Sequence, residues 1–167
     1  MTDAEDIAGI QSRKYLVFHL GDAAYGFGVL RVREIVDPPH LQPSPRTYDH
    51  LAGLMMLRGK SVPVLDLRRR YGFPPPEKKE GSNRCVVVVQ IRLPNDTKPQ
   101  LGLLFDRPGG IAAIRGDDIQ QEAPPLPGAP DDGVIGTVRR DGGTLTLLNP
   151  DRLANDPGIV AMLKELA

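Results

Sequence analysis

Short apolar runs separated by glycine- and proline-rich turns dominate the pattern of hydrophobic and polar positions along this chain. Each run contains some β-branched or aromatic side chains and stops at turn-forming residues, which is typical of strands in an antiparallel sheet. No long amphipathic helical pattern recurs between the runs, so strand–helix crossover units are not indicated. The pattern predicts an all-β chain forming a barrel or a sandwich, with strands at residues 15–20, 25–32, 61–67, 84–93, 101–105, 111–114, 134–138 and 144–148.

The residues between the runs predict hairpins at three places. Gly21-Asp22 separates the first two runs, and Asp141-Gly142-Gly143 separates the last two. Short connections of this composition favour tight antiparallel turns. Pro94-Asn95-Asp96 indicates a third hairpin. The longer proline-rich stretches at 73–83 and 120–132 interrupt a continuing series of strands, so we interpret them as surface loops within one unit.

Two segments are predicted to be helical. Residues 46–51, directly after Pro45, favour one short turn of helix. Near the end of the chain, Asp156 is a suitable N-cap and Pro157 suits the first helical position. The apolar positions that follow predict a helix through Leu166 that packs on the β core. Residues 1–13 are predicted to form a flexible tail.

Charge and cysteine content narrow the class of protein. The 21 basic and 21 acidic residues give a formal net charge of zero, which removes the general electrostatic argument for nucleic-acid binding. No apolar run approaches the length of a membrane span, and the acidic first residues do not resemble a secretory signal. We therefore expect a cytoplasmic protein without direct membrane insertion. Cys85, the single cysteine, is interpreted as a small buried hydrophobe.

The chain offers little that indicates catalysis, and we expect no enzyme, cofactor or metal. Gly53 followed by Gly59-Lys60-Ser61 approaches a phosphate-binding loop, but the spacing is one residue too long and Pro63 stands where a helix must run. The histidines have no metal-ligand spacing between them. They are His19, His40 and His50.

Two acids and one basic cluster at strand ends each allow two interpretations. Asp66 and Asp106 follow apolar runs, where single acids more often accept hydrogen bonds from turn amides than perform acid–base chemistry. Arg68-Arg69-Arg70 occupies a predicted strand-to-loop position. It is either a solvated edge that discourages strand pairing or a phosphate contact in a small-barrel nucleic-acid binder.

One stretch, from Leu51 to Gly72, is far less generic than the rest, and it resembles the core motif of CheW-like domains, which couple components of bacterial chemosensory systems. In that family the motif begins with a glycine, which is followed by Asn-Leu-Arg-Gly and then by a proline within a strand. Asp-Leu-Arg comes next, and an aromatic residue and a glycine end the motif. The matching positions here are Gly53, Leu57, Arg58, Gly59, Pro63, Asp66, Leu67, Arg68, Tyr71 and Gly72. Further segments resemble the family in the expected order over roughly residues 14–154.

The resemblance implies a particular fold. Members of this family consist of two five-stranded β-barrels packed side by side over a shared core, with short helices that include a C-terminal one. We therefore expect residues 14–167 to form a single CheW-like domain of two interleaved barrel subdomains. Gly53, Gly59, Pro63 and Asp66 are expected to hold the turn of the motif in shape.

The resemblance also implies a function as an adaptor that joins a chemoreceptor to a CheA-type histidine kinase. The receptor's cytoplasmic helical hairpin is expected in a groove between the barrels, the kinase's regulatory domain on a different face, and other CheW-like domains as further partners in rings. Arg58 suits the receptor site because a guanidinium holds carboxylates in fixed geometry. The other expected receptor-binding residues are Glu34, Val32, Ile35, Met56 and Leu57. Val32, Ile35 and Leu57 have an alternative interpretation as core residues, which for Ile35 and Leu57 is at least as well supported.

This sequence departs from the family pattern at two places. Met56 stands where the family has asparagine, and Pro108-Gly109-Gly110 stands where the family usually has an apolar residue in a regular segment. These departures leave open an accessory scaffold of a pilus, gliding or other chemosensory pathway. A small β-barrel nucleic-acid binder and a small-ligand regulatory domain remain the alternatives from other classes.

Overall fold

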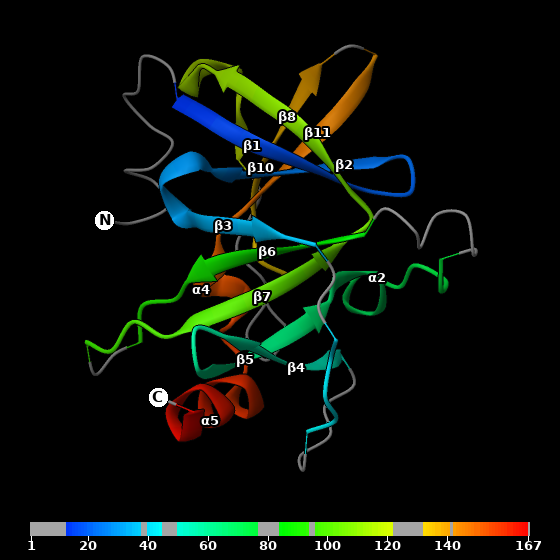
Figure 1. The fold of residues 1–167 in the computed structure, drawn as a ribbon. Helices are drawn as coiled ribbons and strands as arrows, with labels where there is room; N and C mark the ends of the chain where they lie inside the picture. The colour runs from blue at the N-terminus through cyan, green and yellow to red at the C-terminus, as the bar shows by residue number, and fades with distance from the viewer. Residues whose placement is uncertain are drawn as a thin grey trace.

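Two β-sheets packed against each other form most of the chain (Figure 1). The structure is a computed structural model that describes residues 13–37, 40–44, 50–76, 84–93, 96–121, 132–140 and 142–166. The six-stranded sheet has the order β8-β1-β2-β11-β10-β9. Its strands are β1 (Arg13–Leu20), β2 (Ala23–Gly28), β8 (Arg107–Ile114), β9 (Gln120–Gln121), β10 (Val134–Arg140) and β11 (Gly143–Leu148).

The five-stranded sheet has the order β3-β6-β7-β5-β4. Its strands are β3 (Val32–Val36), β4 (Leu51–Leu57), β5 (Lys60–Asp66), β6 (Cys85–Gln90) and β7 (Gln100–Phe105). Short helical segments connect or follow the strands: η1 (Val29–Arg31), α2 (Leu67–Arg70), η2 (Gly116–Asp118), α4 (Pro150–Leu153) and α5 (Pro157–Leu166). The all-β prediction with short helices and a C-terminal helix is confirmed.

Three apolar clusters explain why this chain needs two sheets. Each sheet covers a cluster of its own, represented by Leu147 in the six-stranded sheet and Val64 in the five-stranded sheet. A larger cluster lies between the sheets, where the ring centroids of Phe18 and Phe105 are 5.3 Å apart. The shared core expected from the family resemblance is therefore present. The strand order is open in both sheets, and one sheet has six strands rather than five.

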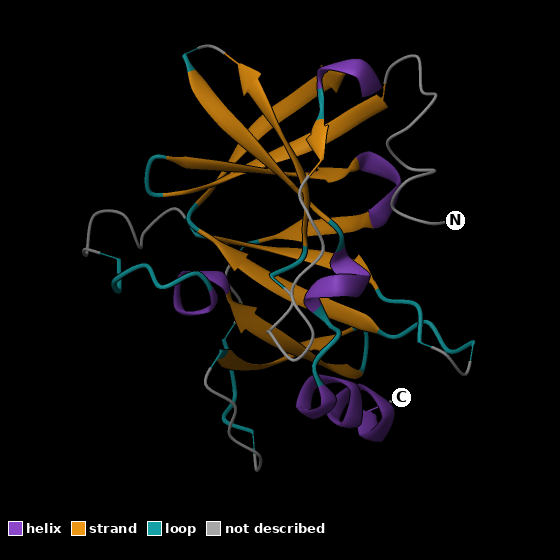
Figure 2. Cartoon of the chain, turned by 180° about the vertical axis from the view of Figure 1, so that it is seen from behind, coloured by secondary structure: helices purple, strands orange, loops and turns teal. Residues whose placement is uncertain are grey.

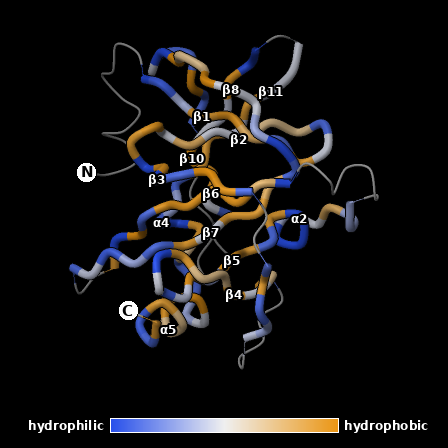
Figure 3. Tube along the Cα trace, viewed as in Figure 1, coloured by the Kyte–Doolittle hydropathy of each residue, from blue (hydrophilic) through white to orange (hydrophobic). Residues whose placement is uncertain are grey.

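Strand β6 shows how the sequence produces this arrangement. Its apolar run is continuous because both faces of the strand are buried. Val86 and Val88 point into the cluster of the five-stranded sheet, whereas Val87 and Val89 point into the core between the sheets. The continuous hydrophobic colour of this strand is visible in Figure 3.

The chain passes between the sheets instead of completing one before starting the other. β2 belongs to the six-stranded sheet, and after the η1 turn the chain enters the five-stranded sheet as β3. The chain returns to the six-stranded sheet at Asp106, which lies between β7 and β8. After β11, helix α5 packs near β5 of the other sheet, as the view from behind in Figure 2 also shows.

The structure corrects several of the predicted elements. Residues 25–32 do not form one strand, because the chain changes sheets at η1. β4 was not predicted, since its leucines and methionines carry little β-strand signal. The predicted helix at 46–51 lies largely outside the described residues, and Leu51 begins β4. The C-terminal helix is confirmed, with Asp156 accepting a hydrogen bond from the Gly158 amide at 2.8 Å.

None of the described helices has the length and apolar character required to cross a membrane.

Candidate functional site

The β4–β5 hairpin presents Arg58 to solvent. Leu57 pairs with Lys60, so the loop consists of Arg58 and Gly59 alone. Both loop residues have positive φ, 49° at Arg58 and 80° at Gly59, as a two-residue hairpin turn of this twist requires. A non-glycine residue in this region of backbone space is uncommon and is often found at functional sites. The turn predicted from the motif is therefore present, with its arginine at the tip.

Arg58 forms an ion pair with Glu34, the second predicted charge. Its Nη1 lies 2.5 Å from Oε1 of Glu34, and the two side chains are 72% and 26% exposed. The hydrogen bond from this guanidinium to Glu34, and then the carboxylate's charge, raise the pKa of Arg58. β3 and β4 are the two edge strands of the five-stranded sheet. The ion pair therefore joins the edge strand β3 to the turn between β4 and β5, and three strands separate β3 from β4 in the hydrogen-bonding order.

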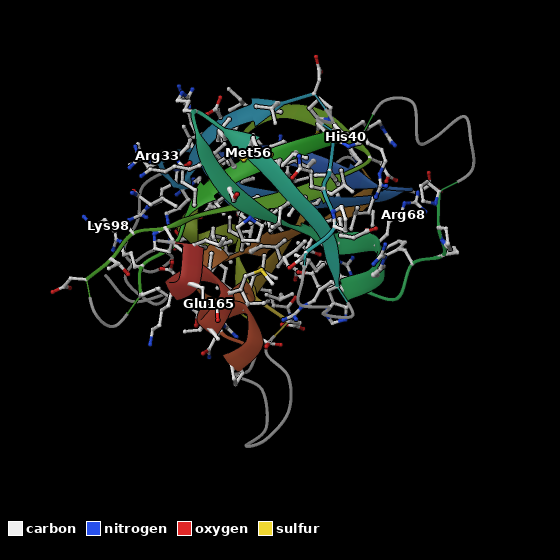
Figure 4. The ribbon with its side chains drawn as sticks, turned by 60° about the horizontal axis from the view of Figure 1, so that its bottom comes forward. Arg33, His40, Met56, Arg68, Lys98 and Glu165 are labelled. Atoms are coloured by element: carbon white, nitrogen blue, oxygen red, sulfur yellow. The ribbon has the colours of Figure 1, made fainter. Side chains whose placement is uncertain are left out.

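Two large apolar side chains on the same edge strands, β3 and β4, are exposed. Met56 is 57% exposed and Ile35 is 42% exposed, although large hydrophobic side chains are usually buried. The Ser61 hydroxyl donates to the sulfur of Met56 at 3.4 Å. In Figure 4, Met56 lies between Arg33 and His40 across the view.

The two remaining predicted contact residues are only half-buried and contribute to the core. Val32 packs against the core between the sheets, and Leu57 packs against the cluster of the five-stranded sheet. The alternative interpretation of Val32 and Leu57 as core residues therefore accounts for these packing contacts. The candidate surface is defined here as Glu34, Ile35, Met56 and Arg58.

Each of the residues predicted to hold the turn in shape has its own structural role. Gly53 has φ 154°, and a Cβ there would lie 2.9 Å from the carbonyl oxygen of Gln42, which bonds to Leu54 across an isolated bridge. Gly59 has open space around it and is required only for its positive φ. Pro63 comes one residue before β5 begins to pair with β7, where its missing N–H removes no bond to β7.

Asp66 is a buried capping residue. Its Oδ1 accepts the Arg68 amide at 3.0 Å at the start of α2, and the Arg84 guanidinium at 3.3 Å. The structure thus agrees with the interpretation of Asp66 as an acceptor for a turn amide.

Arg68 is buried, which excludes it from any phosphate-binding face. Its Nε and Nη2 donate to the two carboxylate oxygens of Asp106 at 2.8 and 2.5 Å, and its Nη1 donates to the carbonyl oxygen of Pro74. Residues 67–70 form α2 rather than the expected strand-to-loop segment, so the side chains do not alternate. Arg69 donates to the Leu51 carbonyl. In Figure 4, Arg68 lies on the opposite side from Arg33.

Asp106 is the charged partner that makes this burial possible. It also accepts the Gly21 amide at 2.6 Å. Burial by itself raises the pKa of Asp106, but the hydrogen bonds from Arg68 and Gly21, and the charges of Arg68 and Arg84, outweigh it and lower the pKa below its ordinary value. Asp106 is thus a structural carboxylate at the crossing between the sheets.

Cys85 is a buried hydrophobe, as its sequence context indicated. Burial, with a smaller contribution from nearby carboxylates, raises the pKa of the Cys85 thiol to about 11. A thiol with this pKa is a poor nucleophile at neutral pH. Among the described residues there is no group of three or more His, Cys, Asp or Glu side chains suited to hold a metal ion.

Two concave regions near the candidate surface were not anticipated. A cavity of about 350 Å³ beside Arg58 is lined by Lys60, Lys98 and the α5 leucines Leu163 and Leu166. A groove of about 550 Å³ lies where the sheets meet, and none of the six predicted receptor-binding residues lines it. Both regions are lined by residues from distant parts of the sequence, so no motif of fixed residue spacing could predict them.

Comparisons with known proteins agree with this architecture. The family model described as "CheW-like domain" matches residues 14–158. The chain is 25% identical to "Chemotaxis protein CheW" of Treponema pallidum, over 83% of this chain and 79% of the relative. It is 36% identical to a protein of the same name from Klebsiella aerogenes, over 65% of this chain and 61% of the relative. The crystal structure of scaffolding protein TtCheW from Thermoanaerobacter tengcongensis matches with a TM-score of 0.71 and 26% identity, over 89% of this chain and 96% of that one.

Proposed function

Because the chain belongs to the CheW-like domain family, whose members are chemotaxis scaffolds, we propose that it is a non-enzymatic cytoplasmic adaptor that couples chemoreceptors to a CheA-type histidine kinase. The receptor's helical hairpin binds at the candidate surface. The kinase's regulatory domain occupies a different face, and other CheW-like domains are further partners in rings.

One observation supports the receptor assignment above the others. Glu34 and Arg58 form an ion pair at the surface, and the apolar side chains of Ile35 and Met56, on the two edge strands β3 and β4, are exposed. A helical hairpin presents an apolar stripe with charges at its margins, so it requires apolar contacts for affinity and fixed charges for register. Arg58, on a two-residue turn, is the most exposed member of this surface.

A titration with the cytoplasmic fragment of the cognate receptor tests the assignment. Arg58→Glu places a second carboxylate opposite Glu34 and reverses the charge offered to the receptor, so we expect binding to weaken at least about tenfold, in the range of a central interface residue. The thermal unfolding midpoint should change little, because exposed ion pairs contribute little to stability.

Arg139→Glu is the matched control, since it makes the same charge change at an exposed position of β10 in the other sheet. Equal receptor affinity for Arg58→Glu and the unmodified protein would show that the receptor binds elsewhere.

The alternative of an accessory scaffold in a pilus, gliding or other chemosensory pathway rests on Pro108-Gly109-Gly110 and on Met56. Its side chain lies in the exposed part of the candidate surface, so the departure from the family's asparagine changes a group that a partner can touch. The alternative of a nucleic-acid binder loses its main support, because Arg68 is buried and paired with Asp106.

A further inference from the structure

Met56 combines high exposure with a reactive sulfur atom. Four large apolar side chains of the described residues are exposed: Leu30, Ile35, Met56 and Ile111. Met56 is 57% exposed, and its thioether is the group in this set that a peroxide oxidises. Oxidation there alters one of the four residues that define the candidate surface.

The other sulfur atoms of the described residues are shielded from solvent. Met55 and Met162 are 1% and 4% exposed. Met55 precedes Met56 in β4, and the alternation of side chains along a strand places the two on opposite faces. Cys85 is buried, and its thiol, with a pKa of about 11, forms little of the thiolate that peroxides oxidise. An oxidant in solution therefore meets the sulfur of Met56 in preference to these three.

A hydroxyl group lies beside the sulfur of Met56. Met56 pairs with Ser61 across the β4–β5 hairpin, and the Ser61 hydroxyl donates to the Met56 sulfur at 3.4 Å. A thioether is a weak hydrogen-bond acceptor, whereas the oxygen of a sulfoxide makes the side chain polar. The same hydroxyl reaches that oxygen after a small rotation of the Met56 side chain. The hairpin therefore accommodates the oxidised side chain in the unbound protein.

The position of Met56 determines what its oxidation changes. The motif that this chain resembles has asparagine here, so this chain carries an oxidisable group where the motif has none. Met56 and Ile35 supply the exposed apolar area of the candidate surface. Oxidation converts a flexible apolar side chain into a polar one. A partner that covers this side chain then loses an apolar contact and buries a polar oxygen, which is unfavourable unless new hydrogen bonds compensate.

We propose that Met56 is a redox-sensitive modification site, and that its oxidation to the sulfoxide by a peroxide weakens receptor binding. The consequence for binding rests on the proposed function, whereas the reaction rests on the exposure of the sulfur. A lone pair of the sulfur attacks one oxygen of the peroxide, the S–O bond forms and the O–O bond breaks. With hydrogen peroxide, the other oxygen leaves as water together with both protons. The sulfur loses two electrons and the peroxide gains them.

Thiol chemistry reverses the modification. A methionine sulfoxide reductase removes the oxygen as water, and a dithiol supplies the two electrons and becomes a disulfide. The protein thus has a reduced and an oxidised state that differ by one oxygen atom on the candidate surface. The reduced state offers the apolar contact and is the binding state.

The first test measures where hydrogen peroxide acts on the full-length protein. Peptide mapping by mass spectrometry should show one added oxygen at Met56 before Met55 or Met162 is modified. The thermal unfolding midpoint should stay unchanged, since the Met56 side chain lies outside the core. Oxidation of Met55 at the same rate as Met56 would overturn the proposal.

The second test compares binding of the cognate receptor's cytoplasmic fragment before and after this treatment. We expect the affinity of the unmodified protein to fall about tenfold on oxidation and to recover after treatment with a methionine sulfoxide reductase. Met56→Gln places a polar oxygen at a similar distance from the backbone and should reproduce the loss without peroxide. Met56→Leu is the matched control, since it keeps the three other methionines and Cys85, and peroxide should leave its affinity unchanged.

The outcomes separate the redox role from the receptor assignment. If oxidation of Met56 leaves the affinity unchanged while Arg58→Glu weakens binding, the receptor assignment stands and the redox role fails. If peroxide weakens binding by Met56→Leu as much as by the unmodified protein, the sensitive group lies elsewhere and the redox role also fails. If neither Arg58→Glu nor oxidation changes the affinity, the receptor assignment is wrong and the redox role falls with it.

Discussion

Two arginines ten residues apart in the same motif have opposite environments. Arg58 lies on a turn with most of its side chain in solvent, whereas Arg68 is buried and forms two hydrogen bonds to Asp106. An exposed ion pair contributes little to stability and leaves its charges available to a partner. A buried one is costly to break, because the remaining charge has no water around it. Stability and recognition are therefore divided between these two arginines.

Removing the carboxylate of Asp106 tests the structural role of Arg68. Asp106→Asn leaves the Arg68 guanidinium buried without a counter-charge, and we expect a loss of about 3–5 kcal/mol in the free energy of unfolding, measured by urea denaturation at pH 7. Asp117→Asn is the control, since its pair with Arg115 is exposed on both sides, and it should change stability by about 1 kcal/mol or less. Equal effects of the two variants would contradict the assigned role.

The pH dependence of the same variant follows from the lowered pKa of Asp106. A carboxyl whose pKa is lower in the folded state stabilises the protein above its unfolded pKa, near the ordinary 3.8, and this contribution is lost as the pH falls through the folded pKa. The stability difference between the unmodified protein and Asp106→Asn should thus be constant near neutral pH and narrow below about pH 4. A difference that narrows between pH 7 and 5 would point to another titrating group.

Met56→Asn tests whether this position selects the partner. Because the side chain is exposed, we expect little change in stability but a change in the relative affinities for a panel of receptor fragments, measured by titration. Met55→Asn is not a suitable control, since Met55 is buried in the core. Identical affinity ranks for the two proteins would remove Met56 as a determinant of receptor preference.

At the scale of elements, the β4–β5 hairpin connects the core to the candidate surface. β4 alternates between buried Met55 and exposed Met56, so one strand anchors the hairpin and presents contact area. Gly53 allows the close approach of residue 42, and Gly59 allows the tight loop that carries Arg58. The orientation of Arg58 therefore depends on two glycines with different functions.

The two glycines should respond differently to alanine. Gly59→Ala adds only the cost of a positive φ, about 1–2 kcal/mol, because the space around it is open. Gly53→Ala adds a clash with the backbone of Gln42 to an unfavourable φ, so its loss in the free energy of unfolding should be the larger. Denaturation curves of both variants check the order, and a smaller effect at Gly53 would contradict it.

At the scale of the whole molecule, the interleaved order of the strands determines how the protein folds. The chain up to β5 contains two strands of the six-stranded sheet and three of the five-stranded sheet, so neither sheet is complete before residue 84. We therefore propose that residues 14–167 fold as one cooperative unit of two barrel-like subdomains.

Dividing the chain within residues 77–83 tests this proposal. Neither fragment contains a complete sheet, so we expect neither to give a dispersed NMR spectrum alone, whereas the intact chain should unfold in a single transition. The intact chain carrying a protease site inserted in the same segment is the control for the insertion itself. A folded fragment would show that one of the subdomains is independent.

The sequence by itself determined the fold class, most strands, the C-terminal helix and the family. These features are local, because they follow from the period of apolar residues, turn chemistry and a motif of fixed spacing. The resemblance predicted four exposed residues as receptor-binding residues without information on their positions in the fold: Glu34, Ile35, Met56 and Arg58. Strands β3, β4 and β9 and the break at residues 29–31 were missed, since local propensity does not record which sheet a strand joins.

Only the tertiary structure decided which charges are exposed and which are paired. Glu34 of β3 and Arg58 of the β4–β5 turn meet although β3 and β4 are opposite edges of one sheet, and Arg68 is buried because Asp106 stands at the crossing to the other sheet. The groove beside Leu30 draws its lining from both sheets. Spacing along the chain encodes none of these contacts, since they depend on how the two sheets pack. The sequence therefore identified the turn that carries Arg58, and the packing of the sheets determined its partner and its neighbours.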